Sequence, residues 1–151
     1  MKKPLTLACL VLVLDQTSKF FVNTFIPLHS ILPIIKPLHF FNLVHFYNTG
    51  IAFSSFQNMN IFFIVFVLIF LSAIIVWLCK NKHKISALQK YAFCLVLSGG
   101  FGNVIDRVFR GGVVDFLDFG INNLRWPSFN VADSSICIAA GLIIFSLIKE
   151  K

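Results

Sequence analysis

Two aspartates stand out because each lies in a short polar patch beside a long apolar run. Asp115 lies in Gly-Val-Val-Asp-Phe at residues 112–116, and Asp133 ends Phe-Asn-Val-Ala-Asp at residues 129–133. The chain has only six acidic residues, and a carboxylate at membrane depth is costly unless it is paired or functional. Two carboxylates at one site can share a proton and activate a water molecule. The chemistry that these residues indicate is therefore acid–base hydrolysis.

Spacing alone leaves two alternatives open for these acids. Asp118 lies three residues beyond Asp115 and is an equal candidate for the partner of Asp133. Asn130 also fits the N-cap of a helix with Asp133 at its third position, which would account for both residues without any chemistry. A cap does not, however, account for Asp115.

A second polar group ends the apolar run before these acids. Residues 98–107 contain three glycines, including Gly99, which allow another helix or a substrate to approach the backbone closely. Asn103 and Arg107 share one helix face at i, i+4. Asn103 can donate and accept hydrogen bonds, and Arg107 can pair with a carboxylate or a lipid phosphate. Asp106 can neutralise a neighbouring arginine.

A third polar group, Asp15 and Lys19, interrupts the first apolar run. The two residues are four apart, so their side chains meet on one helix face. An ion pair inside the membrane allows both charges to be tolerated. We therefore expect Asp15 and Lys19 to brace the helices that carry the site.

The elements that must position these groups are four membrane-spanning helices. Hydrophobic residues make up 58% of the chain and charged residues 13%, which excludes an ordinary soluble domain. Apolar runs of the length that crosses a bilayer cover residues 5–26, 61–79, 88–105 and 131–148. We predict one all-α membrane domain over residues 1–151, with a small extended or β region and loops on the outer face. A turn at 48–50 after an aromatic stretch indicates the extended region.

The lysines set the expected orientation, because cytoplasmic segments of membrane proteins are enriched in Lys and Arg. They gather at the ends of the apolar runs, at Lys2, Lys3, Lys80, Lys82, Lys84, Lys90, Lys149 and Lys151. Both termini are therefore expected in the cytoplasm, with the loops 27–60 and 107–130 outside. Two lysines before an apolar run imitate a signal peptide, but no small-residue cleavage site follows, so we expect an uncleaved first span.

No pattern predicts a metal or a cofactor. The four histidines show no ligand spacing, and the four cysteines form no CxxC pair, so we expect the cysteines to be small buried hydrophobes. No glycine loop of the phosphate-binding type occurs. The basic residues do not gather on one soluble face, which argues against nucleic acid as a partner.

Five motifs in order give the chain a resemblance to lipoprotein signal peptidase (signal peptidase II), the membrane aspartic peptidase of bacteria. They are Asp15-Gln16-x-x-Lys19, Asn48-x-Gly50-x-Ala52-Phe53, Gly99-Gly100-x-Gly102-Asn103-x-Ile105-Asp106-Arg107, Val113-Val114-Asp115-Phe116 and Phe129-Asn130-x-Ala132-Asp133. The resemblance implies that Asp115 and Asp133 form the catalytic dyad, which decides against Asp118. The residues it implies for substrate binding or site orientation are Asn48, Gly99, Asn103, Arg107, Asn130 and Ala132. Those it implies for structural support are Asp15, Lys19 and Asp106.

The resemblance also implies a reaction, cleavage of prolipoproteins on the N-terminal side of a diacylglyceryl-modified cysteine. A signal peptide enters with its N-terminus in the cytoplasm, so its cleavage site lies at the outer face, where the lysine pattern puts the dyad. The implied partners are a lipidated prolipoprotein and membrane lipids, without a cofactor, a metal, nucleic acid or an implied oligomer. The implied location is the bacterial cytoplasmic (inner) membrane.

A different function class fits the same charges. A small transporter or channel subunit also carries intramembrane acids and bases, which line ion paths. That class predicts acids spread across the membrane, whereas most acids here gather toward one face. A serine hydrolase fits less well, because no G-x-S-x-G motif occurs.

Overall fold

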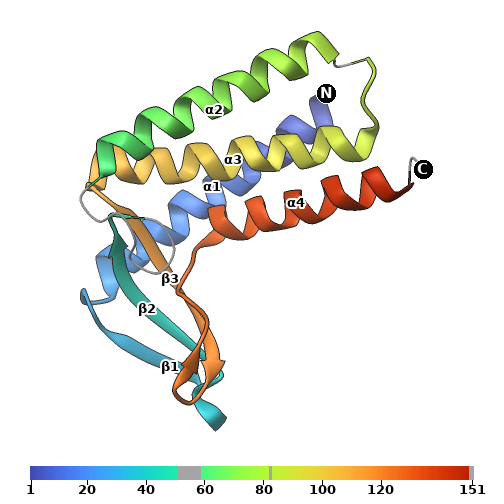
Figure 1. Cartoon of the computed structure of the whole chain (residues 1–151). Helices are drawn as coiled ribbons and strands as arrows, with labels where there is room; N and C mark the ends of the chain where they lie inside the picture. Colours follow the sequence, from blue (N-terminus) through green and yellow to red (C-terminus); the bar gives the residue numbers. More distant parts are fainter. Residues whose placement is uncertain (51–58, 82, 150–151) are drawn as a thin grey trace.

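The computed structural model consists of four long helices and a small antiparallel sheet at one end of them (Figure 1). It describes residues 1–50, 59–81 and 83–149. The helices are α1 (Lys2–Phe25), α2 (Asn60–Asn81), α3 (Ala87–Arg110) and α4 (Val131–Lys149), and each is long and apolar enough to cross a membrane. The four predicted spans are therefore confirmed. Some residues of the predicted motifs and lysine clusters lie outside the described part, namely Ala52, Phe53, Lys82 and Lys151.

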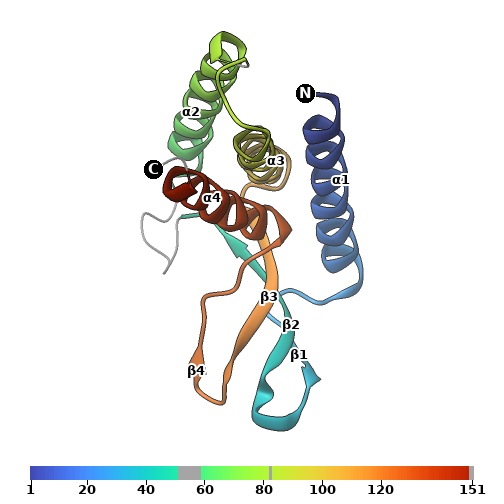
Figure 2. The same ribbon diagram turned by 90° about the vertical axis from the view of Figure 1, so that its right-hand side faces the viewer.

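Helix α3 lies in the middle of the bundle, where it contacts the other three helices (Figure 2). Glycines make these contacts close, because small residues let helix backbones approach each other in membranes. A Cβ atom added to Gly99 would lie 2.4 Å from the Ala132 carbonyl oxygen of α4. An added Cβ would lie 2.6 Å from Asp15 of α1 at Gly102, and 2.6 Å from Leu71 of α2 at Gly100.

The two ends of α3 follow from local sequence. Ser86 caps the first turn, with its side chain accepting from the Gln89 backbone N–H at 3.2 Å while the Gln89 side chain accepts from Ser86 N–H at 2.9 Å. The helix ends at Gly111, whose φ of 78° is the left-handed conformation that glycine adopts readily. The predicted end at residue 105 is therefore too early. Arg107 belongs to the last turn of α3, and not to an outer loop.

The sheet contains the strands β1 (Ile31–Ile35), β2 (Phe41–Asn48), β3 (Val113–Ile121) and β4 (Leu124–Arg125), in that order. A short 3-10 helix, η1 (Pro37–His39), joins β1 to β2. Strand β2 is the predicted extended region, and β1, β3 and β4 extend it. The sheet lies at one end of the helices, whereas both termini and the α2–α3 connection lie at the other end (Figure 1).

The first half of β3 is buried on both faces. Val114 and Phe116 pack with Val22 of α1 in one apolar cluster. Because successive strand residues point to opposite faces, Asp115 lies on the other face, where it is also buried. The start of β3 is therefore held against α1 by one face and presents a buried carboxylate, Asp115, on the other.

Candidate active site

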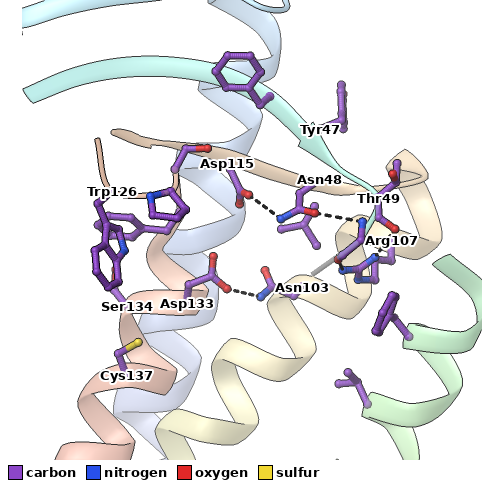
Figure 3. A pocket seen from close by; sticks show the side chains of 18 of the residues that line it. Tyr47, Asn48, Thr49, Asn103, Arg107, Asp115, Trp126, Asp133, Ser134 and Cys137 are labelled. Atoms are coloured by element: carbon purple, nitrogen blue, oxygen red, sulfur yellow. Dashed lines mark hydrogen bonds between the residues drawn. The ribbon is translucent and has the colours of Figure 1, made fainter. Parts of the chain in front are cut away.

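A cavity of about 1040 Å³ lies where the sheet meets α2, α3 and α4, and both Asp115 and Asp133 line it (Figure 3). Asp115 comes from β3 and Asp133 from the first turn of α4. Three other candidates predicted from the sequence also line this cavity: Asn48, Asn103 and Arg107. The structure therefore brings together residues that are up to 85 positions apart, counting from 48 to 133.

Asn130 connects the two aspartates. Its side-chain N–H donates to Asp115 Oδ1 at 2.8 Å, and its side-chain oxygen accepts from the Asp133 backbone N–H at 2.9 Å. Asp133 Oδ2 in turn accepts from the Asn130 backbone N–H at 3.3 Å. The predicted helix cap is therefore present, and the same fully buried asparagine also holds Asp115. The cap and the site are one arrangement rather than alternatives.

Two further asparagines complete the hydrogen bonding of the carboxylates. Asn48 donates from Nδ2 to Asp115 Oδ2 at 3.1 Å, and Asn103 donates from Nδ2 to Asp133 Oδ1 at 2.8 Å. Each aspartate thus receives two N–H groups, one on each oxygen. Neutral amides fix the orientation of both carboxylates without neutralising their charge.

The protonation of Asp115 follows from its surroundings. The residue is only 3% exposed, and burial raises the pKa of its carboxyl group because the charged form loses solvation. The nearby negative charge of Asp133 raises it further, while the hydrogen bonds from Asn48 and Asn130 and the charge of Lys19 oppose the shift. The resulting pKa is about 7, near the value that suits proton transfer at neutral pH.

Asp118, the competing candidate on spacing, lies in a different environment. It pairs with Arg125 at 2.6 Å and accepts from Asn42 Nδ2 at 2.8 Å. It does not line the cavity. An odd separation of three along a strand places Asp115 and Asp118 on opposite faces, so the fold separates the two candidates that sequence spacing left equal.

Arg107 binds oxygens other than those of a carboxylate. Its guanidinium donates to the Gly50 carbonyl at 2.6 Å and to Asn60 Oδ1 at 3.0 Å, and it lies 5.0 Å above the Phe63 ring centre. Gly50 follows β2 and Asn60 begins α2, so Arg107 ties together the residues on either side of 51–58. Its charge also acts on both aspartates across the cavity.

The predicted contact between Asp15 and Lys19 is present at 2.9 Å, and both side chains are buried. Lys19 also pairs with Asp106 at 2.8 Å and donates to Asn103 Oδ1 at 3.0 Å. Asp106 therefore neutralises Lys19, and it also pairs with Arg110. These contacts join α1 to α3 beside the cavity.

Backbone N–H groups complete this buried network. Asp15 Oδ1 accepts from Ala132 N–H at 2.8 Å, at the start of α4, and Asp106 Oδ2 accepts from Val114 N–H at 3.1 Å, in β3. The acids thus fix the two chain segments that carry Asp133 and Asp115. Of the residues predicted for substrate binding or site orientation, three do not line the cavity but lie in contacts around it: Gly99 in the α3–α4 packing, Ala132 on Asp15, and Asn130 between the aspartates.

Several residues of the site carried no prediction. Gln16 donates to the Gly102 carbonyl at 3.1 Å and accepts from Arg110 at 3.0 Å, inside the buried network. A polar residue beside Asp15 in an apolar run could have indicated that Gln16 takes part in the same buried network. The missed residues that line the cavity include Tyr47, Phe63, Trp126, Ser134 and Cys137.

The expectation for the cysteines is wrong for three of the four. Cys94 is buried, whereas Cys9, Cys79 and Cys137 are exposed. The outer surface of a membrane helix is apolar because lipid surrounds it, so an apolar run does not imply burial within the protein. Cys137 lies one turn beyond Asp133 on the cavity side of α4.

The family model described as signal peptidase (SPase) II matches residues 7–149 of this chain. The chain belongs to this family. Signal peptidase II is a membrane aspartic peptidase, so the chain is an enzyme of that class, and the transporter and channel alternatives are set aside.

Individual relatives match this signal peptidase II along almost its whole length. The lipoprotein signal peptidase of Alteromonas mediterranea is 38% identical over 149 residues, which cover 97% of this chain and 80% of the relative. That of Syntrophus aciditrophicus is 38% identical over 160 residues, which cover 100% of this chain and 98% of the relative. A solved structure described as a bacterial membrane enzyme is 32% identical, with a TM-score of 0.89 over 99% of this chain and 90% of the other.

Proposed function

We propose that Asp115 and Asp133 are the catalytic dyad with which this enzyme cleaves diacylglyceryl-modified prolipoproteins on the N-terminal side of the lipidated cysteine. Membership of the family supports the broader activity, removal of signal peptides from prolipoproteins. One observation carries the assignment of the dyad. Asp115, which is buried, and Asp133, which is half-buried, come from different elements, line one cavity and are held by the same asparagine, Asn130.

The two carboxylates would act as one acid and one base. The ionised aspartate takes a proton from water, whose oxygen attacks the scissile carbonyl carbon, while the protonated aspartate gives its proton to the carbonyl oxygen. The tetrahedral intermediate then collapses. Its C–N bond breaks, and the amine nitrogen receives the proton that the base had taken from water. A hydroxyl proton of the intermediate returns to the aspartate that was protonated at the start. The pair ends with one proton, as it began, and releases a carboxylic acid and an amine.

The cavity walls fit a substrate with a lipid chain. Phe63 and Val67 of α2 and Cys137 of α4 line the cavity together with residues of the sheet, so its lining extends from the sheet along the membrane-spanning helices. Apolar walls of this kind accept acyl chains from the bilayer. Asn48 and Arg107 line the end nearer the sheet, where polar groups can hold the peptide backbone.

The distribution of lysines supports an outer-face site in the cytoplasmic membrane. The described lysines at the helix ends away from the sheet include Lys2, Lys3, Lys80, Lys84 and Lys149, and both termini lie at this end (Figure 1). By the positive-inside rule this end is cytoplasmic. The cavity at the opposite end then faces outward, where the cleavage site of an inserted signal peptide emerges.

Cleavage of a lipidated prolipoprotein by the purified enzyme in detergent tests this function. We expect release of the signal peptide, with an unlipidated precursor as the substrate control. Asp115→Asn and Asp133→Asn should each abolish release, and the double variant should be no worse, because the two carboxylates act as a unit. Substantial cleavage by either folded single variant would exclude a dyad at these positions.

A further inference from the structure

We propose that Lys19 is a positioning residue for the reaction: through Asn103 it holds Asp133 as the ionised base, and it leaves the shared proton on Asp115. This inference rests on the proposed dyad. It assigns the acid and the base, and it gives Lys19 a role in the chemistry in addition to its ion pairs.

The first step is that Lys19 is a fixed cation. Its ammonium group has three N–H donors and no acceptor. The three donors meet three oxygens, Asp15 Oδ2 at 2.9 Å, Asp106 Oδ2 at 2.8 Å and Asn103 Oδ1 at 3.0 Å. The side chain is 0% exposed, so solvent does not compete for these bonds.

The second step is that this cation fixes the Asn103 amide. Lys19 can only donate, so Asn103 must turn its oxygen toward Lys19 and its NH₂ group away. A flipped amide would bring NH₂ against the ammonium group. In the observed orientation Asn103 Nδ2 donates to Asp133 Oδ1 at 2.8 Å. Asp133 Oδ1 therefore always meets a donor.

The third step is that both oxygens of Asp133 act as acceptors. Oδ1 accepts from Asn103, and Oδ2 accepts from the Asn130 backbone N–H. A proton on either oxygen would face or displace one of these N–H groups, whereas the ionised carboxylate satisfies both. The bond from Asn103 is also polarised by Lys19, because a chain of hydrogen bonds that begins at a cation strengthens its last member.

Asp115 has two amide donors as well, but neither of these amides contacts a cation directly, as Asn103 contacts Lys19. The Asn48 side-chain oxygen accepts from Gly50 N–H at 3.1 Å, and the Asn130 side-chain oxygen accepts from Asp133 N–H at 2.9 Å. Both asparagine oxygens therefore meet neutral backbone N–H groups, and Arg107 reaches the Asn48 chain only through the Thr49 and Gly50 carbonyls. The raised pKa of Asp115, about 7, agrees with a proton on this residue.

The remaining charges around the pair do not reverse this difference. Arg107 of α3 interacts with both aspartates, more with Asp115 than with Asp133, but its guanidinium donates to neither of them. Asp15 of α1 and Asp106 of α3 are in direct contact with Lys19 and offset part of its long-range field. What distinguishes the two aspartates is the hydrogen-bonded link from Lys19, which reaches Asp133 alone.

An infrared pH titration of the purified enzyme locates the proton directly. The carboxylic acid C=O band that disappears as the pH rises through about 7 should be missing in Asp115→Asn. In Asp133→Asn the band should remain, but it should disappear at a lower pH than in the wild type, because the neighbouring negative charge that raises the pKa of Asp115 is gone. A band near pH 7 that survives in Asp115→Asn and is lost in Asp133→Asn would overturn the assignment. This titration needs no substrate, so an enzyme that fails to cleave prolipoproteins would refute the proposed function separately.

The role of Lys19 is tested by the pH profile of kcat for Lys19→Met and Lys19→Arg. Lys19→Met should move the acid side of the kcat profile to higher pH by about one unit, with KM unchanged. On that side of the profile, about tenfold fewer enzyme molecules would then hold the ionised base. Lys19→Arg keeps a cation and should restore much of the profile. Arg110→Gln is the matched control, because Arg110 belongs to the same network but does not contact Asn103; it should alter stability only.

A variant that breaks only the link covers the case in which Lys19→Met does not fold. Asn103→Ala leaves both ion pairs of Lys19 in place and should reproduce the acid-side shift. An unchanged profile in Asn103→Ala, or in folded Lys19→Met that merely melts earlier, would show that Lys19 is structural only.

Discussion

Asp115→Asn should abolish cleavage and, above pH 7, make the folded protein more stable. The reason is that Asp115 is buried beside a second carboxylate, which raises its pKa from 3.8 to about 7. Each pKa unit corresponds to about 1.4 kcal/mol, so a shift of about three units costs the folded state about 4 kcal/mol once Asp115 is ionised. Asparagine has the same shape and no charge.

The pH window follows from the direction of the shift. Between about pH 4 and pH 7 the folded protein holds the Asp115 proton and the unfolded chain does not, so folding stability falls as the pH rises through this window. Below it both states are protonated and the cost is absent. Above it the full cost applies. Asparagine does not titrate, so the variant lacks this part of the pH dependence.

The gain is reduced by a lost hydrogen bond. Asp115 accepts N–H groups from Asn48 and Asn130, and the NH₂ of an asparagine can accept neither. One donor is therefore left unpaired, which costs about 1–3 kcal/mol. The net expectation is a gain of about 1–3 kcal/mol above pH 7 and a loss of similar size below pH 4, so the stability curves of the two proteins cross.

Thermal unfolding in detergent between pH 4 and pH 9 measures this crossing. Asp118→Asn is the matched control, because it removes a carboxylate that pairs with Arg125, and it should give no gain at any pH. Folded Asp115→Asn that melts at or below the wild-type temperature throughout pH 7–9 would refute the argument. It would mean that ionised Asp115 is stabilised in a way that its contacts do not explain.

Asp118→Asn should also retain most of the cleavage activity, because this residue does not line the cavity; a loss equal to that of Asp115→Asn would identify the wrong acid. Asp15→Asn should lower the unfolding free energy by about 3–5 kcal/mol, because a buried cation loses a partner, and a normal melting temperature would contradict this. Gly99→Ala should cost about 1–3 kcal/mol through overpacking against α4, whereas Gly141→Ala, with open space around the added Cβ, should not. Wild-type cleavage should decline above about pH 7 as Asp115 loses its proton, and a rate that still rises at pH 9 would argue against an acid at this position.

The helices could be predicted because a bilayer imposes a simple requirement, about 20 apolar residues in succession. The sequence locates their ends less closely. Helix α3 continues five residues beyond the predicted end at 105, to Arg110, because Gly111 is the first residue that adopts a left-handed conformation. A polar sequence at a helix end does not break the helix when the side chains find partners, as those of Asp106 and Arg107 do.

The sheet was only partly predicted, and the strands that were missed share a physical cause. Strand β3 is buried on both faces at its start, so it lacks the alternation of apolar and polar residues that marks a half-buried strand. Strand β1 is exposed throughout and apolar, so it shows no alternation either. Only β2, with a turn after it, carried a local signal.

The site was predicted through its motifs, and its contacts were not. The i, i+4 pair of Asp15 and Lys19 is local and could be predicted from spacing alone. The bond from Lys19 to Asn103 joins residues 84 apart in the chain, and it depends on the close packing that Gly102 allows between α1 and α3. Such a contact has no signature in local sequence. The motifs thus identified which residues take part, and only the fold shows which residue binds which.

The acids of this protein differ in their partners more than in their burial. In the described residues Asp15, Asp106 and Asp118 each contact a lysine or arginine, whereas neither Asp115 nor Asp133 has a cation within ion-pair distance. Four of the five are buried and Asp133 is half-buried, so burial alone does not mark function. A carboxylate in contact with a cation has its charge balanced there and supports the fold. Two carboxylates that receive only neutral amides can keep one proton between them, and this is the state that hydrolysis by an acid and a base requires.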